Sequence, residues 1–402
     1  MRALLLVLLA LALGACATTE SYSPDDLYGE DPVLVVAQPE FDPPAVAQNP
    51  APPPAPAAPP VEDLFEQPDR FAALPGWATA DLAPALAAFR RSCASFLQAD
   101  PDARLNPNLP QYGRYRDWQP ACFALDGAMD ARRYFETHFA PAALSSATAT
   151  QGLLTGYYEP EVEVRLRADA EFSEPILAKP ADPAVQRLPR KAFNARSSRV
   201  IAYGRPIDVF FLQIQGSGRL RFADGRSLRA AYAANNGQPY RSIGRVLIER
   251  GELTRDQSAK RNIEAWMEQA GPKAARALMN ENPRYIFFVE QAIRPGEGPN
   301  GAMRVPLTAM GSIAVDPRYH PYGTLAFLNT KTPTRARDYR GADAALLVAM
   351  QDTGSAIKGP LRGDLFFGAG DAAGALAGVQ KHPVRWTLLL PKAIAPSVQP
   401  VS

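Results

Sequence analysis

The chain has 402 residues, with 43 Lys or Arg against 41 Asp or Glu, and therefore a formal net charge of +2. Acidic and basic side chains are interspersed and form no long basic run, so a nucleic-acid partner has no electrostatic support. A neutral or zwitterionic polymer suits such a surface better.

The N-terminus reads MRALLLVLLALALGAC: Arg2, an apolar stretch over residues 3–13, and then small residues before Cys16. This is the layout of a secretory signal and is too short to span a bilayer. The ending Leu-Gly-Ala-Cys resembles a bacterial lipobox, although an ordinary signal with an incidental cysteine stays open. We expect residues 1–16 to be a lipoprotein signal peptide and Cys16 to carry the lipid. Because Ala17 follows, we expect an anchor in the outer membrane, facing the periplasm.

A proline-rich segment follows the signal. Between Pro39 and Pro60, ten of 22 residues are proline. Such a segment cannot bury a core and is typical of an extended, polyproline-like tether. We assign residues 17–64 to a disordered tether, which reaches roughly 70 Å over its proline-rich part, and expect the folded part to begin near residue 65.

The cysteines and histidines favour a disulfide over a metal site. Without Cys16, an even pair remains, Cys93 and Cys122, which in an oxidising compartment indicates a disulfide. Neither has a second cysteine or a histidine at ligand spacing. The histidines are far apart in sequence, and we expect no metal site.

Helices are predicted at several places. Apolar residues recur at spacings of three and four between Leu82 and Phe96, which predicts a helix with Cys93 facing the core. A second short helix is expected around residues 128–139. Two more helices are opened by the cap residues Ser242 and Asp256 and closed by Gly251 and Gly271.

Short apolar runs bounded by glycine and proline predict strands. They lie at residues 153–158, 209–214, 284–289, 324–328, 345–350 and 385–390. Short strands punctuated in this way favour a small β-barrel over a parallel α/β sheet.

The segment QDTGSAIKGPLRGD, residues 351–364, offers several chemistries. A phosphate-binding loop requires its lysine after the second glycine, whereas here Lys358 precedes Gly359. Arg-Gly-Asp matches an adhesion signal in only three letters, a match that chance explains. An aspartic peptidase requires a second Asp-Thr-Gly, and only 50 residues follow Asp352.

Paired aspartates also suit glycoside chemistry, which requires a carboxylic acid that is protonated near neutral pH. Asp364 is followed by Leu-Phe-Phe, and Asp352 lies close in sequence. Desolvation and a like charge both raise a carboxyl pKa from its usual value of about 3.9. By spacing alone, however, these aspartates are more typical of turn residues than of a catalytic pair.

Whole stretches of the chain resemble the membrane-bound lytic murein transglycosylase A family. The matching blocks are LLTGYYEP (153–160), FFLQIQGSGRL (210–220), NGQPYRSIGRVLIERGEL (236–253), NPRYIFF (282–288), VPLTAMGSIAVDPRYHPYGTL (305–325) and QDTGSAIKGPLRGDLFFGAGDAAG (351–374). The C-terminal blocks resemble a module named for three aspartates, which correspond to Asp316, Asp352 and Asp364.

The resemblance implies a mainly β fold with flanking helices: a double-psi β-barrel domain and a second, inserted β domain, separated by a substrate groove. We expect the barrel to comprise residues 65–159 and 289–394, and the inserted domain residues 160–288. Between Pro160 and Phe210 the chain looks shorter than the family's usual insertion, which leaves the number of sugar subsites open.

The resemblance also implies the chemistry. Such enzymes cleave the β-1,4 bond between N-acetylmuramic acid and N-acetylglucosamine in peptidoglycan without water and leave a 1,6-anhydro sugar. A single aspartate, by resemblance Asp364, acts first as acid and then as base, with Asp352 beside it and Asp316 as the third member. No cofactor is implied. An inverting hydrolase and an inactive peptidoglycan-binding scaffold remain as alternatives.

Softer assignments concern the substrate. Polar and aromatic groups converge in ligand clefts, and the residues expected to contact the glycan are Tyr157, Tyr158, Gln215, Gly216, Ser217, Gly218, Tyr240 and Lys358. The expected partners are peptidoglycan glycan strands, the lipid anchor in the outer membrane, and cell-wall synthesis or division proteins, for a protein that is otherwise monomeric.

Overall fold

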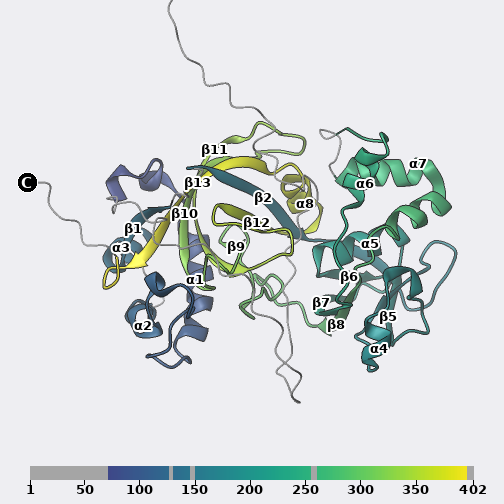
Figure 1. Cartoon of the computed structure of the whole chain (residues 1–402), viewed down its shortest axis with the longest axis horizontal. Helices are drawn as coiled ribbons and strands as arrows, with labels where there is room; N and C mark the ends of the chain where they lie inside the picture. The colour runs from purple at the N-terminus through teal and green to yellow at the C-terminus, as the bar shows by residue number, and fades with distance from the viewer. Residues whose placement is uncertain (1–70, 126–129, 145–149, 255–259, 396–402) are drawn as a thin grey trace, which may run out of the picture.

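A computed structural model describes residues 71–125, 130–144, 150–254 and 260–395 of the chain. Cys16, the tether and Asp256 lie outside these residues. The described strands form two sheets, which lie side by side along the longest axis of the molecule (Figure 1). This arrangement confirms the expected mainly β fold with two β units.

The first sheet closes into a barrel. Its strands run in the order β1 (Phe139–Leu144), β13 (Lys381–Pro391), β10 (Leu325–Thr332), β11 (Ala342–Asp352), β9 (Ser312–Ala314), β12 (Arg362–Ala369) and β2 (Gly152–Glu159). A further pairing of β13 with β2 joins the two ends of this order. Closure leaves β1 as an added strand and removes the free edges of the other strands.

The barrel strands have mixed directions. β11 and β12 run parallel to β9 and β2, respectively, whereas β12 pairs with β9 in the antiparallel sense. The short strand β9 therefore lies between β11, which precedes the glycine-rich segment, and β12, which follows it. Side chains of Ile313, Leu365 and Trp386 fill one face of this region as part of the largest core cluster.

Helices cover the barrel at the N-terminal end of the described chain. They are η3 (Phe71–Ala73), η4 (Trp77–Thr79), α1 (Ala83–Phe96), η5 (Pro110–Tyr112), α2 (Tyr115–Phe123) and α3 (Ala131–His138), and α8 (Gly370–Ala377) follows β12. The predicted helix with a coreward cysteine is confirmed in α1, where Cys93 is buried. Cys93 forms a disulfide with Cys122 of α2.

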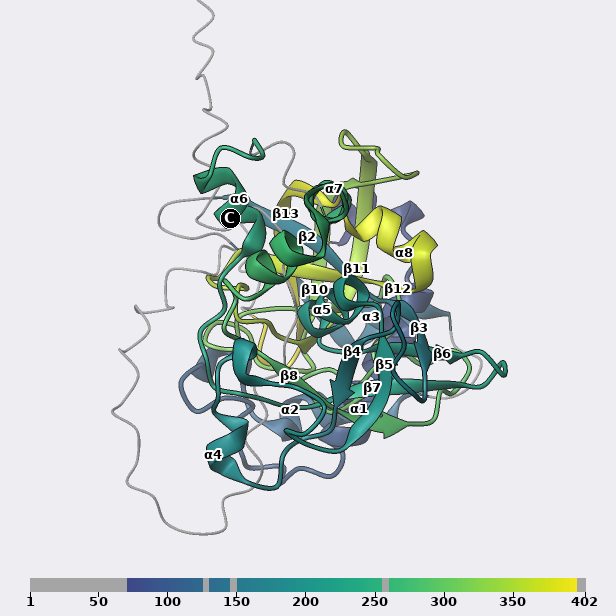
Figure 2. The same cartoon turned by 90° about the vertical axis from the view of Figure 1, so that its right-hand side faces the viewer.

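The second sheet holds β4 (Glu174–Leu177), β5 (Val200–Gly204), β3 (Glu161–Arg165), β6 (Gly218–Phe222), β7 (Ser227–Asn235) and β8 (Ile286–Gln291), in that order. Its helices are α4 (Pro183–Gln186), η6 (Arg190–Ala192), α5 (Pro206–Gln215), α6 (Ile243–Glu249) and α7 (Lys260–Met279). Seen from the right-hand side of Figure 1, these elements lie in front of the barrel (Figure 2).

The predicted strand over residues 209–214 is wrong, because this run forms α5. Pro206 occupies the first turn, and Gly216 closes the helix in the left-handed conformation with φ 79°. Residues 209–215 are all buried, so no polar face marks the helical period. A short, continuously apolar run cannot be told from a buried strand by its pattern.

The capped helices are largely as predicted. The side chain of Ser242 accepts a hydrogen bond from the Arg245 amide at the start of α6. Gly271, with φ 83°, interrupts α7, but a second helical segment continues from there to Met279.

A buried ion cluster marks the point where the chain leaves the barrel. Glu159, the last residue of β2, is fully buried and accepts hydrogen bonds from Arg229 of β7 and from Arg219 of β6, the latter at 3.0 Å. Arg229 also donates to the carbonyl of Glu297 at 2.8 Å, on the segment that returns to the barrel. Removing one partner from such a cluster would leave an uncompensated buried charge.

The disulfide gives a stability prediction. It closes a loop with a sequence separation of 29 residues, so the double variant Cys93→Ala/Cys122→Ala should lose about 3–4 kcal/mol of unfolding free energy in the loop-entropy account. Urea denaturation measures this loss, with the wild type under reducing conditions as the matched comparison. An unchanged urea midpoint would contradict the assignment of this bond as a stabilising element.

Candidate active site

Two of the three predicted aspartates face the same alanine. In the barrel register, Asp352 of β11 and Asp364 of β12 are both partners of Ala314 in β9, one on each side. On the far side of Asp364, the partner is Thr155 of β2. Neighbouring strands lie about 4.8 Å apart, which separates the two aspartate Cα atoms by roughly 10 Å, with only a methyl side chain between them.

Asp364 is the most enclosed of these groups. Its side chain is fully buried, Oδ1 accepts a hydrogen bond from the Thr155 hydroxyl at 2.5 Å, and Oδ2 has no partner. Burial raises the pKa of Asp364 to about 7, with a further contribution from Asp352, against the lowering effects of Arg362 and Thr155. Asp364 is therefore a carboxylic acid that holds its proton near neutral pH.

The neighbouring side chains fix where this proton sits. The guanidinium of Arg362 donates to Thr155 Oγ1 at 2.9 Å, so the threonine hydroxyl must point its own hydrogen at Asp364. Oδ1 is thus occupied as an acceptor. The proton of the acid belongs on Oδ2, the oxygen that is free to donate it.

Asp352 is held as an ionisable partner. Its Oδ2 accepts a hydrogen bond from the Tyr157 hydroxyl at 2.8 Å, and its Oδ1 accepts from the backbone amides of Ala302, at 3.0 Å, and Thr353, at 2.9 Å. Burial raises the pKa of Asp352 to about 6, and these three hydrogen bonds limit the rise. Asp352 is therefore the carboxyl group of the pair whose charged form receives more hydrogen bonds.

Asp316 has a different environment. Burial alone would raise its pKa, but hydrogen bonds from Arg318 and from the Gly359 amide outweigh that effect and lower it. Arg318 Nη2 lies 2.7 Å from Asp316 Oδ2, and the Gly359 amide donates to the same oxygen at 2.8 Å. Asp316 is thus an ionised anchor for the segment between β11 and β12.

His320 holds the same segment one residue further on. Its Nε2 lies 2.6 Å from the carbonyl oxygen of Pro360, and its Nδ1 lies 2.9 Å from the Tyr112 hydroxyl. The ring also stacks on Trp386. Burial lowers the pKa of His320 to about 4, so the neutral ring donates from Nε2 to the carbonyl and accepts from the tyrosine.

The Arg-Gly-Asp letters have a structural explanation. A Cβ atom at Gly363 would lie 2.6 Å from Ile313 and 2.8 Å from the ring of Trp386, so only glycine lets β12 approach β9 and β13. Arg362 orients Thr155, and Asp364 faces Ala314. The sequence pattern is typical of a turn at Asp364, but this residue lies inside β12 and pairs with strands on both sides.

Several residues expected to contact the glycan lie in the structure as follows. Tyr157 is 3% exposed, and its ring packs on Phe366, so it holds Asp352 and presents little ring face to a sugar. Tyr158 points to the other face of β2, where its hydroxyl lies 3.2 Å from Lys260 Nζ. Gln215 Oε1 lies 3.4 Å from the Tyr158 amide.

The remaining candidates are dispersed. Gly216 ends α5, Ser217 is buried, and Gly218 begins β6, where a Cβ would meet Leu212 at 2.4 Å. Tyr240 packs against the helical core formed by α5, α6 and α7. Lys358 is exposed on the segment between β11 and β12.

A cavity of about 280 Å³ lies between the two β units, between α7 and α8. Seven of its lining residues carry polar or aromatic side chains: Tyr158, Lys260, Arg261, Glu264, Arg337, Tyr339 and Asp371. Arg261 Nη2 donates to the Tyr339 hydroxyl at 2.6 Å and so links α7 to the segment between β10 and β11. The cavity therefore combines hydrogen-bonding groups with aromatic rings, which suits a carbohydrate.

Two side chains of the site were not predicted from the sequence. Thr155 and Arg362 direct the Asp364 proton, and both lie within the quoted motifs. Thr155 stands two residues before Tyr157, which binds Asp352, and Arg362 stands two residues before Asp364. The alternation of faces along a strand could have placed Thr155 beside Tyr157.

A closed barrel with paired buried aspartates, joined to an inserted β unit, defines a recognisable class of protein. Residues 185–289 match the family profile described as "MltA specific insert domain", and residues 311–390 match the one described as "3D domain". Together the two matches span most of the second sheet and the C-terminal barrel strands.

Individual relatives agree with these two family matches. The chain is 36% identical over 241 residues to membrane-bound lytic murein transglycosylase A of Escherichia coli K12, a match that covers 58% of this chain and 64% of that relative. It thus spans less than two thirds of the length of the curated relatives it matches.

Solved structures cover more of the chain. A membrane-bound lytic murein transglycosylase from Agrobacterium tumefaciens is 30% identical, with a TM-score of 0.69, over 82% of this chain and 98% of that one. Escherichia coli MltA with bound chitohexaose is 27% identical, with a TM-score of 0.62, over 83% and 94% of the respective chains. The chain belongs to the membrane-bound lytic murein transglycosylase A family.

The raised pKa of Asp364 predicts a pH-dependent effect on stability. The folded-state value of about 7 lies above the ordinary value of 3.8, so the folded state resists ionisation of this group and loses stability as the pH rises between these values. The variant Asp364→Asn removes this loss and should be more stable than the wild type at pH 8, by up to about 4 kcal/mol. The difference should shrink toward pH 4.

Urea denaturation from pH 4 to pH 8 measures this effect. Asp343→Asn is the matched control, because Asp343 lies on β11 with a side chain that is 92% exposed. If the stability difference between Asp364→Asn and the wild type did not grow with pH, the assignment of a raised pKa would be wrong.

Proposed function

We propose that this protein is a lytic transglycosylase that cleaves the β-1,4 bond between N-acetylmuramic acid and N-acetylglucosamine in peptidoglycan. The reaction uses no water and yields 1,6-anhydromuramyl products. The observation that carries the proposal is the fully buried Asp364, whose pKa of about 7 and unpartnered Oδ2 suit a general acid. Membership of the family supports the choice of substrate.

In the first step, Asp364 donates the proton on Oδ2 to the glycosidic oxygen. The bond from this oxygen to C1 of the muramyl sugar breaks, and an oxocarbenium-like centre develops at C1. The resulting negative charge on Asp364 is stabilised by the hydrogen bond from Thr155 and by the nearby Arg362.

In the second step, the same carboxylate acts as a base. Asp364 Oδ2 accepts the proton of the muramyl 6-hydroxyl, while the oxygen of that hydroxyl forms a bond with C1 of the same sugar. Asp364 is then protonated as at the start, and the sugar carries a 1,6-anhydro bridge. All protons are accounted for without a co-reactant.

Asp352 and Asp316 take supporting roles in this proposal. Asp352, ionised and held by Tyr157, raises the pKa of Asp364 and opposes its early ionisation. Its negative charge also favours the positive centre at C1. Asp316 holds the Gly359 amide and so positions the segment that leads into β12.

We place part of the glycan strand along the cavity between α7 and α8. Its lining combines the ring of Tyr158 with the charged groups of Lys260, Glu264 and Asp371. The solved relative with bound chitohexaose supports a sugar chain as the occupant of such a site. Gln215 of α5 accepts a hydrogen bond from the amide of Tyr158 at 3.4 Å and so holds the backbone beside this cavity.

We further propose that Cys16 carries a lipid anchor in the outer membrane, with the folded part facing the periplasm, and that residues 17–64 act as the tether. The relatives' description as membrane-bound supports an anchor. Among the helices that the structure describes, none is long and apolar enough to cross a bilayer. The domain division expected from the sequence, 65–159 with 289–394 and 160–288, remains part of this proposal.

The first activity prediction concerns the acid. Replacing Asp364 by Asn keeps the shape of the side chain but removes the transferable proton, so formation of anhydromuropeptides should fall by roughly 10²–10⁴-fold. Mass spectrometry of muropeptides released from sacculi measures the product, and Asp343→Asn is the control. Full activity of the Asp364 variant would remove this residue from the mechanism.

The products also separate the alternatives. Reducing sugar ends in place of anhydro ends would identify a hydrolase, and inversion of configuration at C1 would identify the mechanism in which Asp352 activates a water molecule. Glycan binding without turnover by the wild type would identify a binding scaffold.

The second activity prediction concerns pH. Because Asp352 must be ionised and Asp364 protonated, the rate should rise with ionisation of Asp352 near pH 6 and fall with ionisation of Asp364 near pH 7. Thr155→Val removes a hydrogen bond that lowers the pKa of Asp364, so the alkaline limb should move to higher pH. Initial rates from pH 4 to pH 9 test both points, and an alkaline limb that stays in place or moves down would contradict the role of Thr155.

A further inference from the structure

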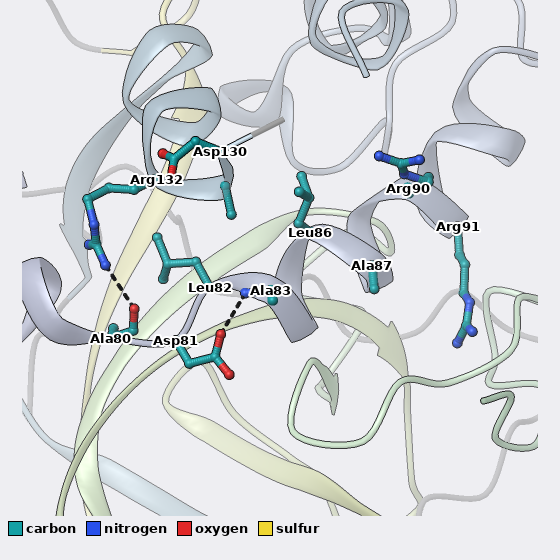
Figure 3. Close-up of a pocket in the computed structure, with 11 residues that line it drawn as sticks. Ala80, Asp81, Leu82, Ala83, Leu86, Ala87, Arg90, Arg91, Asp130 and Arg132 are labelled. Carbon is teal, nitrogen blue, oxygen red and sulfur yellow. Dashed lines mark hydrogen bonds between the residues drawn. The ribbon is translucent and has the colours of Figure 1, made fainter. Parts of the chain in front are cut away.

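Helix α1 holds the segment that returns from the second sheet to the barrel. Arg91 of α1 donates hydrogen bonds to the carbonyl oxygens of Gly296 at 2.9 Å, Pro306 at 3.1 Å and Leu307 at 3.0 Å, and to the Thr308 hydroxyl at 2.9 Å. Arg91 lines a cavity of about 710 Å³, but its side chain leaves α1 in a different direction from that of Arg90 (Figure 3). Four acceptors thus converge on one guanidinium group.

The segment bound by Arg91 is a hairpin. The Gly298 amide donates to the Leu307 carbonyl at 3.0 Å, the Leu307 amide to Pro299 at 2.9 Å, and the Gly301 amide to Val305 at 3.0 Å. We refer to residues 298–307 as the return hairpin. Arg91 contacts the chain just before its first arm and along its second arm, and therefore closes its base.

The tip of the return hairpin reaches the candidate active site. The Ala302 amide donates to Asp352 Oδ1 at 3.0 Å, and the Met303 amide donates to the Gln351 carbonyl at 3.0 Å. At the adjacent Gly301, a Cβ atom would lie 2.5 Å from the Gln351 carbonyl oxygen. The tip is therefore in close contact with the end of β11.

The same helix also holds the end of β11. Gln351 Nε2 donates to the Ala88 carbonyl at 2.7 Å and to the Ser92 hydroxyl at 2.8 Å, and Gln351 is fully buried. Helix α1 thus binds both the strand that carries Asp352 and the hairpin that donates to it. The position of the return hairpin relative to the end of β11 therefore depends on α1.

We propose that Arg91 is a positioning residue of the reaction, which keeps the Ala302 amide on Asp352 by closing the base of the return hairpin. The proposal rests on the proposed function of the aspartate pair. Arg91 touches neither aspartate and acts through backbone that it holds. Its positive charge also faces Glu297 on the same segment.

Loss of this contact has a defined consequence at Asp352. The groups that face its carboxylate are the Tyr157 hydroxyl from β2, Asp364 from β12, and the amides of Thr353 and Ala302. The Ala302 hydrogen bond lowers the pKa of Asp352. If the hairpin tip moves away, the pKa of Asp352 rises, and this residue ionises only at higher pH.

The test compares Arg91→Gln and Arg91→Lys with Arg90→Gln, whose residue is the exposed neighbour on the same helix. Hydrogen–deuterium exchange of the intact protein at residues 298–307 reports the hairpin independently of activity. We expect roughly tenfold faster exchange in Arg91→Gln, a smaller change in Arg91→Lys, which keeps the charge but not the fork of donors, and no change in Arg90→Gln.

The pH profile of anhydromuropeptide formation is the second readout. In Arg91→Gln the acid limb should move up by about half to one pH unit while the alkaline limb stays in place. A uniform loss of rate with an unmoved acid limb, or unchanged exchange in the hairpin, would overturn the proposal. If the wild type formed no anhydro product, the proposed function would fail, whereas the exchange result would still decide whether Arg91 holds the hairpin.

Discussion

The burial of the Asp364 carboxyl group, with one oxygen bound and the other free, is the constraint on which the rest of the site depends. A buried carboxylate is costly unless it is paired, and this one keeps its proton instead. The surroundings then have to supply a hydrogen bond to one oxygen only, which Thr155 does. They also have to keep the second carboxylate close but ionisable, which the small Ala314 and the donors around Asp352 achieve.

The closed barrel meets these requirements because strands from distant parts of the sequence become neighbours. β2, β9, β11 and β12 each contribute one position to a row across the sheet. The glycine-rich segment between β11 and β12 is fixed at consecutive residues, since Asp316 binds the Gly359 amide and His320 binds the Pro360 carbonyl. The third aspartate of the motif thus holds the backbone, whereas the other two are the pair that the proposed mechanism uses.

Much of this could be predicted from the sequence. The cysteine face of α1, the strands β2, β10, β11 and β13, and the family followed from spacing, short apolar runs and quoted motifs. The strand position of Asp364 did not, because Gly-Pro and Arg-Gly-Asp are typical of turns, and only pairing with β2 and β9 makes this segment a strand. Helix α5 was missed because it is buried on every side. The Ala302 amide left no signal, since every residue except proline carries that donor.

The second sheet is joined to the barrel at two places, and each lies next to one of the aspartates. The outgoing connection is β2, whose Thr155 donates a hydrogen bond to Asp364 and which ends at the buried Glu159. The incoming connection ends in the return hairpin, whose Ala302 amide donates a hydrogen bond to Asp352. Arg229 of the second sheet binds both connections, through Glu159 and the Glu297 carbonyl. The covalent chain therefore links the position of the second sheet to the hydrogen bonds on both carboxyl groups. Under the proposed function, a glycan that pulls on this sheet would change the acidity of the site.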